Sequence, residues 1–251
     1  MNAVPLTKAT EIIDRANAFA RAGGPFASRD DLWWRSLKRQ VDDVIKIDPG
    51  VGWSTYGTIM ALVGDVEEME RGFRAALPFA GARPDIITNW LVNKSNLGYY
   101  SEALQLSIEY ADPKTGYFTD RYPILVRAGG FSAASKFLVR AREMGIEIAS
   151  LDPERIELAA QLLSRAELSD EDIARHLDIA GTLMREMGHL HVGNPIVDVQ
   201  DVDGVFSGVT YVLNMRLGQE DVFELNCALA DAEVEKGIKR HPYFDISFAA
   251  A

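Results

Sequence analysis

Hydrophobic and polar residues recur with two different periods along this chain. Up to about residue 190, apolar residues return every three or four positions, which is the period of an amphipathic helix. One such helix is expected to begin at Ser28, with an apolar stripe formed by Trp33, Leu37, Val41 and Val44. From Gly193 onward the period becomes two, which is typical of β-strands. We therefore expect an α-helical domain over residues 1–190 and a small α/β domain over residues 191–251.

The segment after residue 190 contains three stretches with strand periodicity and one with helix periodicity. In chain order these are a strand over 196–200, a strand over 205–217, a helix over 219–237 and a strand over 243–249. Asp203-Gly204, between the first two strands, is a strong signal for a tight hairpin turn. The order predicts a ββαβ domain whose helix packs on the apolar face of the sheet. Because a helix joins the second strand to the third, these two strands should be parallel.

A sheet of three strands has two unpaired edges, which proteins rarely leave bare. Pairing with a second copy of the chain, or with a strand of a partner, would satisfy the backbone groups of one edge. We expect a homodimer through the C-terminal sheet. The alternative is that another segment of the same chain covers an edge.

A pattern of aromatic and small residues recurs before residue 145. Gly64 and Gly98 lie 34 residues apart, and a degraded third copy is centred on Gly129. Each glycine is expected in the turn between two helices, with a positive φ, whereas Ala103 and Ala134 are expected where two helices touch. A fixed period of 34 residues is typical of helical hairpins that stack into an array.

Over residues 50 to 145 this pattern resembles the tetratricopeptide repeat family. The first copy matches best, at Trp53, Gly57, Gly64, Phe73 and Ala76. The sequence departs from the family at Met69 and Tyr110, where the family has alanine, and the third copy follows the second after only 31 residues. The resemblance implies a mostly α protein, in which antiparallel helical-hairpin repeats form an α-solenoid, followed here by the small ββαβ α+β domain. It further implies a protein–protein interaction scaffold or adaptor, regulatory or chaperone-like, that binds its partner in a helical-repeat groove.

In this family the first helix of each unit lines the groove. Carried onto this sequence, the resemblance implies six partner-binding residues: Thr58, Leu62, Thr88, Val92, Asn96 and Arg127. This set lacks the lysine and asparagine residues with which some relatives hold the terminal carboxylate of a peptide. We therefore expect an internal segment or a folded partner in the groove. The alternative is that the tail or the N-terminal helices of the chain fill the groove.

Charge narrows the class of partner. The chain has 26 Lys and Arg residues against 37 Asp and Glu residues, a net charge of −11. Nucleic-acid binders need clustered basic residues, so we expect no nucleic-acid partner, and a protein or peptide with a basic surface is favoured. The sequence has no run of 18 apolar residues, so no membrane span is expected. With a single cysteine and no apolar signal region, a cytoplasmic location is expected.

Candidate chemistry is confined to the histidines. All four lie in the last third of the chain, at His176, His189, His191 and His241. The spacing of His189 and His191 occurs in zinc sites, but no further ligands follow at a recognisable spacing. Phosphate-binding loop and nucleophile-elbow motifs are also absent from the sequence. We expect no enzyme, no cofactor and no metal. The alternative interpretation is a metal-dependent hydrolase with its site in the C-terminal domain.

Overall fold

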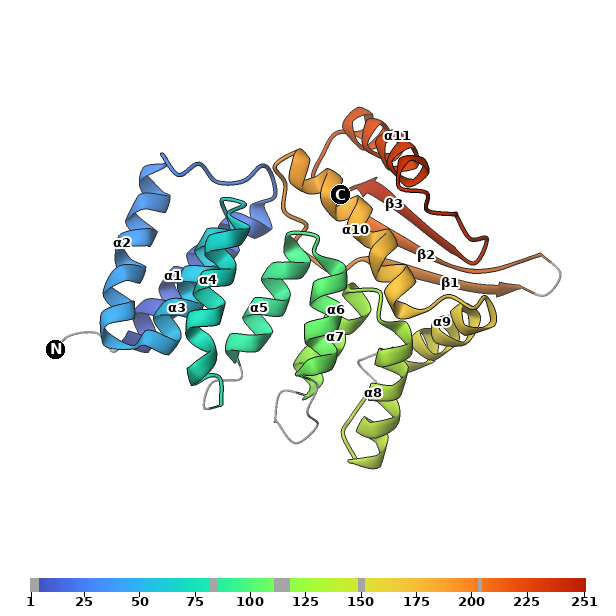
Figure 1. Cartoon of the computed structure of the whole chain (residues 1–251), viewed down its shortest axis with the longest axis horizontal. Coiled ribbons are helices and arrows are strands. Elements are labelled where there is room, and N and C mark those ends of the chain that lie inside the picture. Colours follow the sequence, from blue (N-terminus) through green and yellow to red (C-terminus); the bar gives the residue numbers. More distant parts are fainter. Residues whose placement is uncertain (1–4, 82–84, 111–117, 149–151, 203–204) are drawn as a thin grey trace. The chain divides into compact units, whose positions relative to one another are not determined.

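The computed structural model describes residues 5–81, 85–110, 118–148, 152–202 and 205–251. Within these ranges the chain is mostly helical and ends in a three-stranded sheet (Figure 1), which confirms the coarse fold class expected from the sequence. The stacking of the helices into a solenoid stays a prediction. The elements are α1 (Pro5–Ala22), α2 (Leu32–Ile47), α3 (Pro49–Ala61), α4 (Val66–Ala76), the short 3-10 helix η1 (Leu77–Phe79), α5 (Asp85–Asn96), α6 (Tyr100–Glu109), α7 (Phe118–Arg127), α8 (Phe131–Glu143), α9 (Pro153–Arg165), α10 (Asp170–Glu186), β1 (Ile196–Val202), β2 (Phe206–Met215), α11 (Gln219–Glu235) and β3 (Phe244–Ala250).

The chain divides into two compact units. The first unit contains Met1–Leu97 and Arg185–Val192, and the second contains Gly98–Met184 and Gly193–Ala251. This division differs from the boundary at residue 190 that the change of period indicated. The reason is that the sheet has no hydrophobic core of its own. Its buried side chains belong to one cluster with those of helices α6 to α11, so the sheet and these helices fold around a shared core.

The second helix of the first unit begins later than expected. It starts at Leu32 rather than Ser28, and its buried stripe is formed by Trp34, Leu37, Val41 and Val44. The indole Nε1 of Trp34 donates a hydrogen bond to the carbonyl oxygen of Ile59, 3.3 Å away. Trp33, which we expected on the stripe, is half-buried, with its ring centroid 4.7 Å from that of Phe19. The expectation that Trp33 belongs to the buried stripe was therefore wrong.

The three repeat glycines have the backbone conformation that the pattern predicted. Their φ angles are +68° at Gly64, +71° at Gly98 and +79° at Gly129, a region that residues with a Cβ rarely adopt. In the second unit, Gly98 also meets Gly181 of α10. A Cβ atom added to Gly98 would lie 2.4 Å from the Cα of Gly181, so both positions require glycine. Ala103 and Ala134 are fully buried, as expected for residues at close helix contacts.

Helix α10 caps two other helices of the second unit. The Oδ1 of Asp178 accepts hydrogen bonds from the backbone N–H of Tyr100 (2.7 Å) and Ser101 (3.1 Å), at the start of α6. The carboxylate of Asp170 accepts from the N–H of Ser132 and Ala133 (2.8 Å each), at the start of α8. The residues at the N-cap positions of α6 and α8 supply no capping side chain of their own. The two aspartates thus accept hydrogen bonds from the backbone N–H groups at the N-termini of α6 and α8, which have no capping side chain of their own.

Removing one of these distant caps should destabilise the second unit. We expect Asp178→Ala to lower the free energy of unfolding by ~1–2 kcal/mol, which is the usual cost of losing an N-cap side chain. The control is Asp231→Ala, on the exposed side of α11, which should cost almost nothing. Thermal unfolding followed by far-ultraviolet circular dichroism compares the two variants. Equal melting temperatures would show that the Asp178 bonds add nothing to stability.

The sheet has the expected topology. Its order is β1-β2-β3, with β1 and β2 antiparallel and β2 and β3 parallel (Figure 1). Every second residue of β2 from Val209 to Met215 is buried, together with Phe244, Ile246 and Phe248 of β3. Val205, with which the second strand was expected to begin, precedes β2 and is 81% exposed. The predicted turn at Asp203-Gly204 lies outside the described residues.

Candidate functional site

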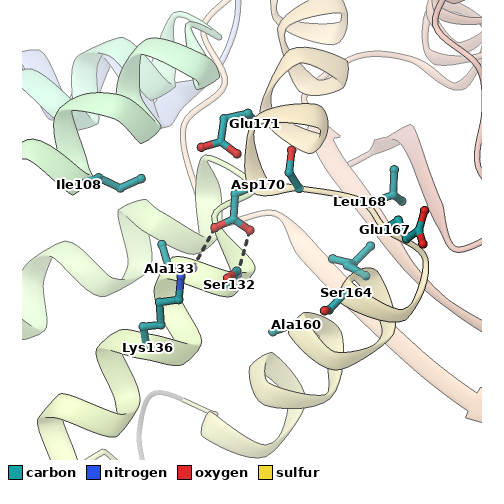
Figure 2. A pocket seen from close by; sticks show the side chains of 12 residues that line it. Ile108, Ser132, Ala133, Lys136, Ala160, Ser164, Glu167, Leu168, Asp170 and Glu171 are labelled. Atoms are coloured by element: carbon teal, nitrogen blue, oxygen red, sulfur yellow. Dashed lines mark hydrogen bonds between the residues drawn. The ribbon is translucent and has the colours of Figure 1, made fainter.

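The second unit contains an open cavity of about 500 Å³ (Figure 2). Its walls come from α6, the N-terminal half of α8, the C-terminal half of α9 and the start of α10. Cavities of this size are typical of sites that bind ligands or side chains of a partner. We call it the α8–α10 pocket. Its lining residues are Ile108, Ser132, Ala133, Lys136, Ala160, Leu163, Ser164, Glu167, Leu168, Ser169, Asp170 and Glu171.

One part of the lining is apolar. Leu163 is buried, and Ala133, Ala160 and Leu168 are half-buried beside it. Ile108 is 49% exposed at the edge of the pocket. Together these residues offer an apolar surface of the kind that receives an aliphatic or aromatic side chain.

The rest of the lining is polar and mainly acidic. It has three carboxylates, at Glu167, Asp170 and Glu171, against the single ammonium group of Lys136. The carboxylate of Asp170 points toward Ser132 and Ala133 and accepts hydrogen bonds from their backbone N–H groups (Figure 2). Burial raises the pKa of Asp170 in spite of these bonds. Glu167, Glu171 and Lys136 are exposed. The rim therefore favours a group that carries positive charge.

The six partner-binding residues implied by the resemblance are divided between the two units. Thr58 and Leu62 on α3 and its C-terminal turn are buried, and Thr88, Val92 and Asn96 on α5 are half-buried, all in the first unit. The structure connects α3 and α5 through a contact between the Asn93 amide and the Thr58 hydroxyl, 3.4 Å apart. The binding role of these five residues stays a prediction.

The sixth residue, Arg127, lies in the second unit at the C-terminal end of α7. Its side chain is buried, and this burial lowers the pKa of the Arg127 guanidinium. Its carbonyl oxygen accepts a hydrogen bond of 2.6 Å from the hydroxyl of Tyr211 on β2. In the structure Arg127 thus connects α7 to the sheet.

The histidines have separate structural partners. His189 Nδ1 lies 2.9 Å from the carbonyl oxygen of Met187, and His191 is buried with its backbone N–H bonded to Asn96. His241 Nδ1 accepts the N–H of Tyr243. Within the described ranges, no group of three or more His, Cys, Asp and Glu side chains is placed to hold a metal ion.

His176 belongs to a hydrogen-bonded network around the buried carboxylate of Glu233, which sequence reasoning missed. Its Nε2 lies 2.6 Å from Glu233 Oε1 on α11, and the guanidinium Nε of Arg240 lies 2.5 Å from Glu233 Oε2. The side chain of Glu233 is only 2% exposed. These contacts connect α10, α11 and the segment before β3. The sequence offered one signal, because Glu233 follows Leu225 and Leu229 on the apolar side of α11.

None of the described helices combines the length and the hydropathy that a membrane span requires. Comparisons with models of protein families, with curated protein sequences and with solved structures gave no match. The likeness to tetratricopeptide repeats therefore remains a resemblance of sequence pattern.

Proposed function

We propose that this protein is an interaction module that binds a basic segment of a partner protein. The observation that supports this best is the α8–α10 pocket, which places an apolar surface next to exposed carboxylates in one open cavity. A partner segment with an aliphatic or aromatic anchor beside a lysine or arginine would complement both parts. The net charge of −11 would attract such a segment from a distance.

The anchor would lie against Ile108, Ala160 and Leu163, and the basic group would meet Glu167 and Glu171. Asp170 is already engaged by the start of α8, so its role is to hold the pocket wall in place. The three serines of the lining offer hydroxyl groups to the backbone of the partner. The half-buried α5 residues Thr88, Val92 and Asn96 remain a second proposed contact surface, as the family resemblance implies.

Selection from a random peptide library displayed on phage tests the proposal. Purified full-length protein should enrich peptides with an apolar residue beside Lys or Arg. Ser164→Trp places an indole at an exposed position of the pocket wall, and it should weaken binding of the selected peptides about tenfold or more, because it blocks the anchor site. Gln161→Trp is the control, since this residue is exposed on the same helix but does not line the pocket.

The charge requirement is tested separately. The double variant Glu167→Lys with Glu171→Lys should lose affinity for the same peptides, whereas Glu220→Lys with Glu224→Lys on α11 makes an equal change in net charge elsewhere. Fluorescence anisotropy of a labelled selected peptide gives the affinities of the wild type and the four variants. Equal weakening by both double variants would mean that only the net charge matters, and undiminished binding by Ser164→Trp would place the site outside this pocket.

A further inference from the structure

The two outer strands of the sheet differ in whether the backbone N–H and C=O groups on their outer edges have hydrogen-bond partners. On β3, the side-chain amide of Asn226 on α11 donates to the carbonyl oxygen of Phe248 (2.9 Å) and accepts its N–H (2.8 Å). Because these two backbone groups bond to Asn226, they are turned away from β2. The amide makes the same pair of bonds that a fourth strand would make, so the middle of the β3 edge is already occupied.

The β1 edge has no such cover among the described residues. There β1 pairs with β2 alone, and five of its seven residues are exposed. Ile196 and Val202 point to the outer face of the sheet and are 52% and 50% exposed, and Phe206, which pairs with Val202 across the hairpin, is 44% exposed. An edge strand with exposed aliphatic ends is a template for pairing with another chain.

The sequence of β1 complements itself when two copies run antiparallel about Val199, the middle residue of the strand. In that register Ile196 lies opposite Val202 of the second copy, and Asp198 lies opposite Gln200 of the second copy. Asp201 lies opposite Val197 of the second copy, and its Oδ2 is 3.6 Å from Nη1 of Arg165 in its own chain. No two carboxylates are opposed, and the aliphatic residues meet at both ends.

Other registers fit less well. Sliding the strands by two residues in one direction places Asp198 opposite Asp198 of the second copy, which is repulsive. Sliding them by two residues in the other direction avoids opposed carboxylates but leaves Ile196 without Val202. A shift of one residue is excluded, because side chains alternate between the two faces and residues of the outer face would then lie opposite residues of the inner face.

We propose that β1 pairs with β1 of a second copy and forms a six-stranded sheet about a two-fold axis at Val199. The dimer would cover the exposed edge and group Val202 and Phe206 of each chain with Ile196 of the other. This surface is separate from the α8–α10 pocket, so either proposal can fail without the other.

Charge changes at Gln200 test the register. Gln200→Asp would place a carboxylate opposite Asp198 of the other chain, twice in each dimer, and should raise the dimer dissociation constant about fivefold. Gln200→Lys would instead create two pairs of opposite charge and should lower the dissociation constant by a similar factor. Ser247→Asp and Ser247→Lys are the matched controls, because Ser247 lies on the same face of the sheet but on β3. These controls should leave the constant unchanged.

Sedimentation velocity of the full-length chain over a concentration series measures all five proteins. A dimer that tightens with Gln200→Lys and weakens with Gln200→Asp supports the proposal. A species of 27.7 kDa at every concentration would overturn it, as would a dimer that responds equally to the changes at Gln200 and Ser247.

Discussion

Replacing Glu233 with alanine is expected to be among the most damaging single changes in the second unit. The carboxylate is almost fully buried, and it accepts from both His176 and Arg240. Alanine would leave the His176 ring, which is 8% exposed, without its acceptor and would remove the connection between α10 and α11. Leaving a buried hydrogen-bonding group without its partner typically costs ~1–3 kcal/mol, and we expect a loss in that range, because the Arg240 side chain is 56% exposed and remains solvated.

Glu235→Ala is the control for this change, because Glu235 is exposed two residues further along the same helix. Hydrogen–deuterium exchange of peptides from α10 and α11 localises the effect to the second unit. All four tryptophans, Trp33, Trp34, Trp53 and Trp90, lie in the first unit, so their fluorescence reports on that unit alone. A Glu233→Ala protein with unchanged exchange in α10 and α11 would mean that the network does not stabilise the second unit.

Gly181→Ala is expected to destabilise the protein, although alanine is the better helix former. Propensity alone predicts a gain of about 1 kcal/mol for this change inside a helix. In the structure, however, a Cβ at position 181 would lie 2.0 Å from the carbonyl oxygen of Gly98. This contact is with backbone, which cannot rotate away, so overpacking should outweigh the propensity. We expect a net loss of about 2 kcal/mol or more.

Gly145→Ala separates overpacking from backbone strain. Gly145 has φ +69°, but nothing lies within 4 Å of a Cβ added there, so that substitution meets strain only. It should cost about 1 kcal/mol, less than Gly181→Ala. Urea unfolding followed by circular dichroism ranks the two variants. A Gly181→Ala protein more stable than the wild type would show that α6 and α10 do not approach as closely as described.

The elements that the sequence predicted best are those set by local signals. Alternation of side chains gave the three strands, and the helix between the last two required them to be parallel. The turn glycines followed from the same logic, because few residues other than glycine adopt a positive φ. These signals lie within a few residues of the feature that they specify.

The features that were missed depend on residues far apart in the chain. Asp178 caps α6, which begins 78 residues earlier at Tyr100, and no residue near Tyr100 indicates in the sequence that Asp178 is its partner. The role of Gly181 is visible only beside Gly98, which is distant in the sequence. Likewise, the α8–α10 pocket combines residues from four helices, so no short motif could reveal it.

The placement of Trp33 and Trp34 failed for a different reason. The two tryptophans are neighbours on α2 and flank the stripe of Leu37, Val41 and Val44 on either side, so periodicity alone does not decide which of them is buried. Tertiary contacts decide it, because the indole of Trp34 donates to the carbonyl oxygen of Ile59 on α3.

Binding of a basic, apolar-anchored segment in the α8–α10 pocket is tested most directly by hydrogen–deuterium exchange with and without a selected peptide. We expect slower exchange at the start of α8, around Ser132 and Ala133, and over residues 160–171 when the peptide is bound. The Ser164→Trp variant should lose this protection. Protection confined to α3 and α5 would contradict the pocket and place the partner against Thr58, Val92 and their neighbours instead.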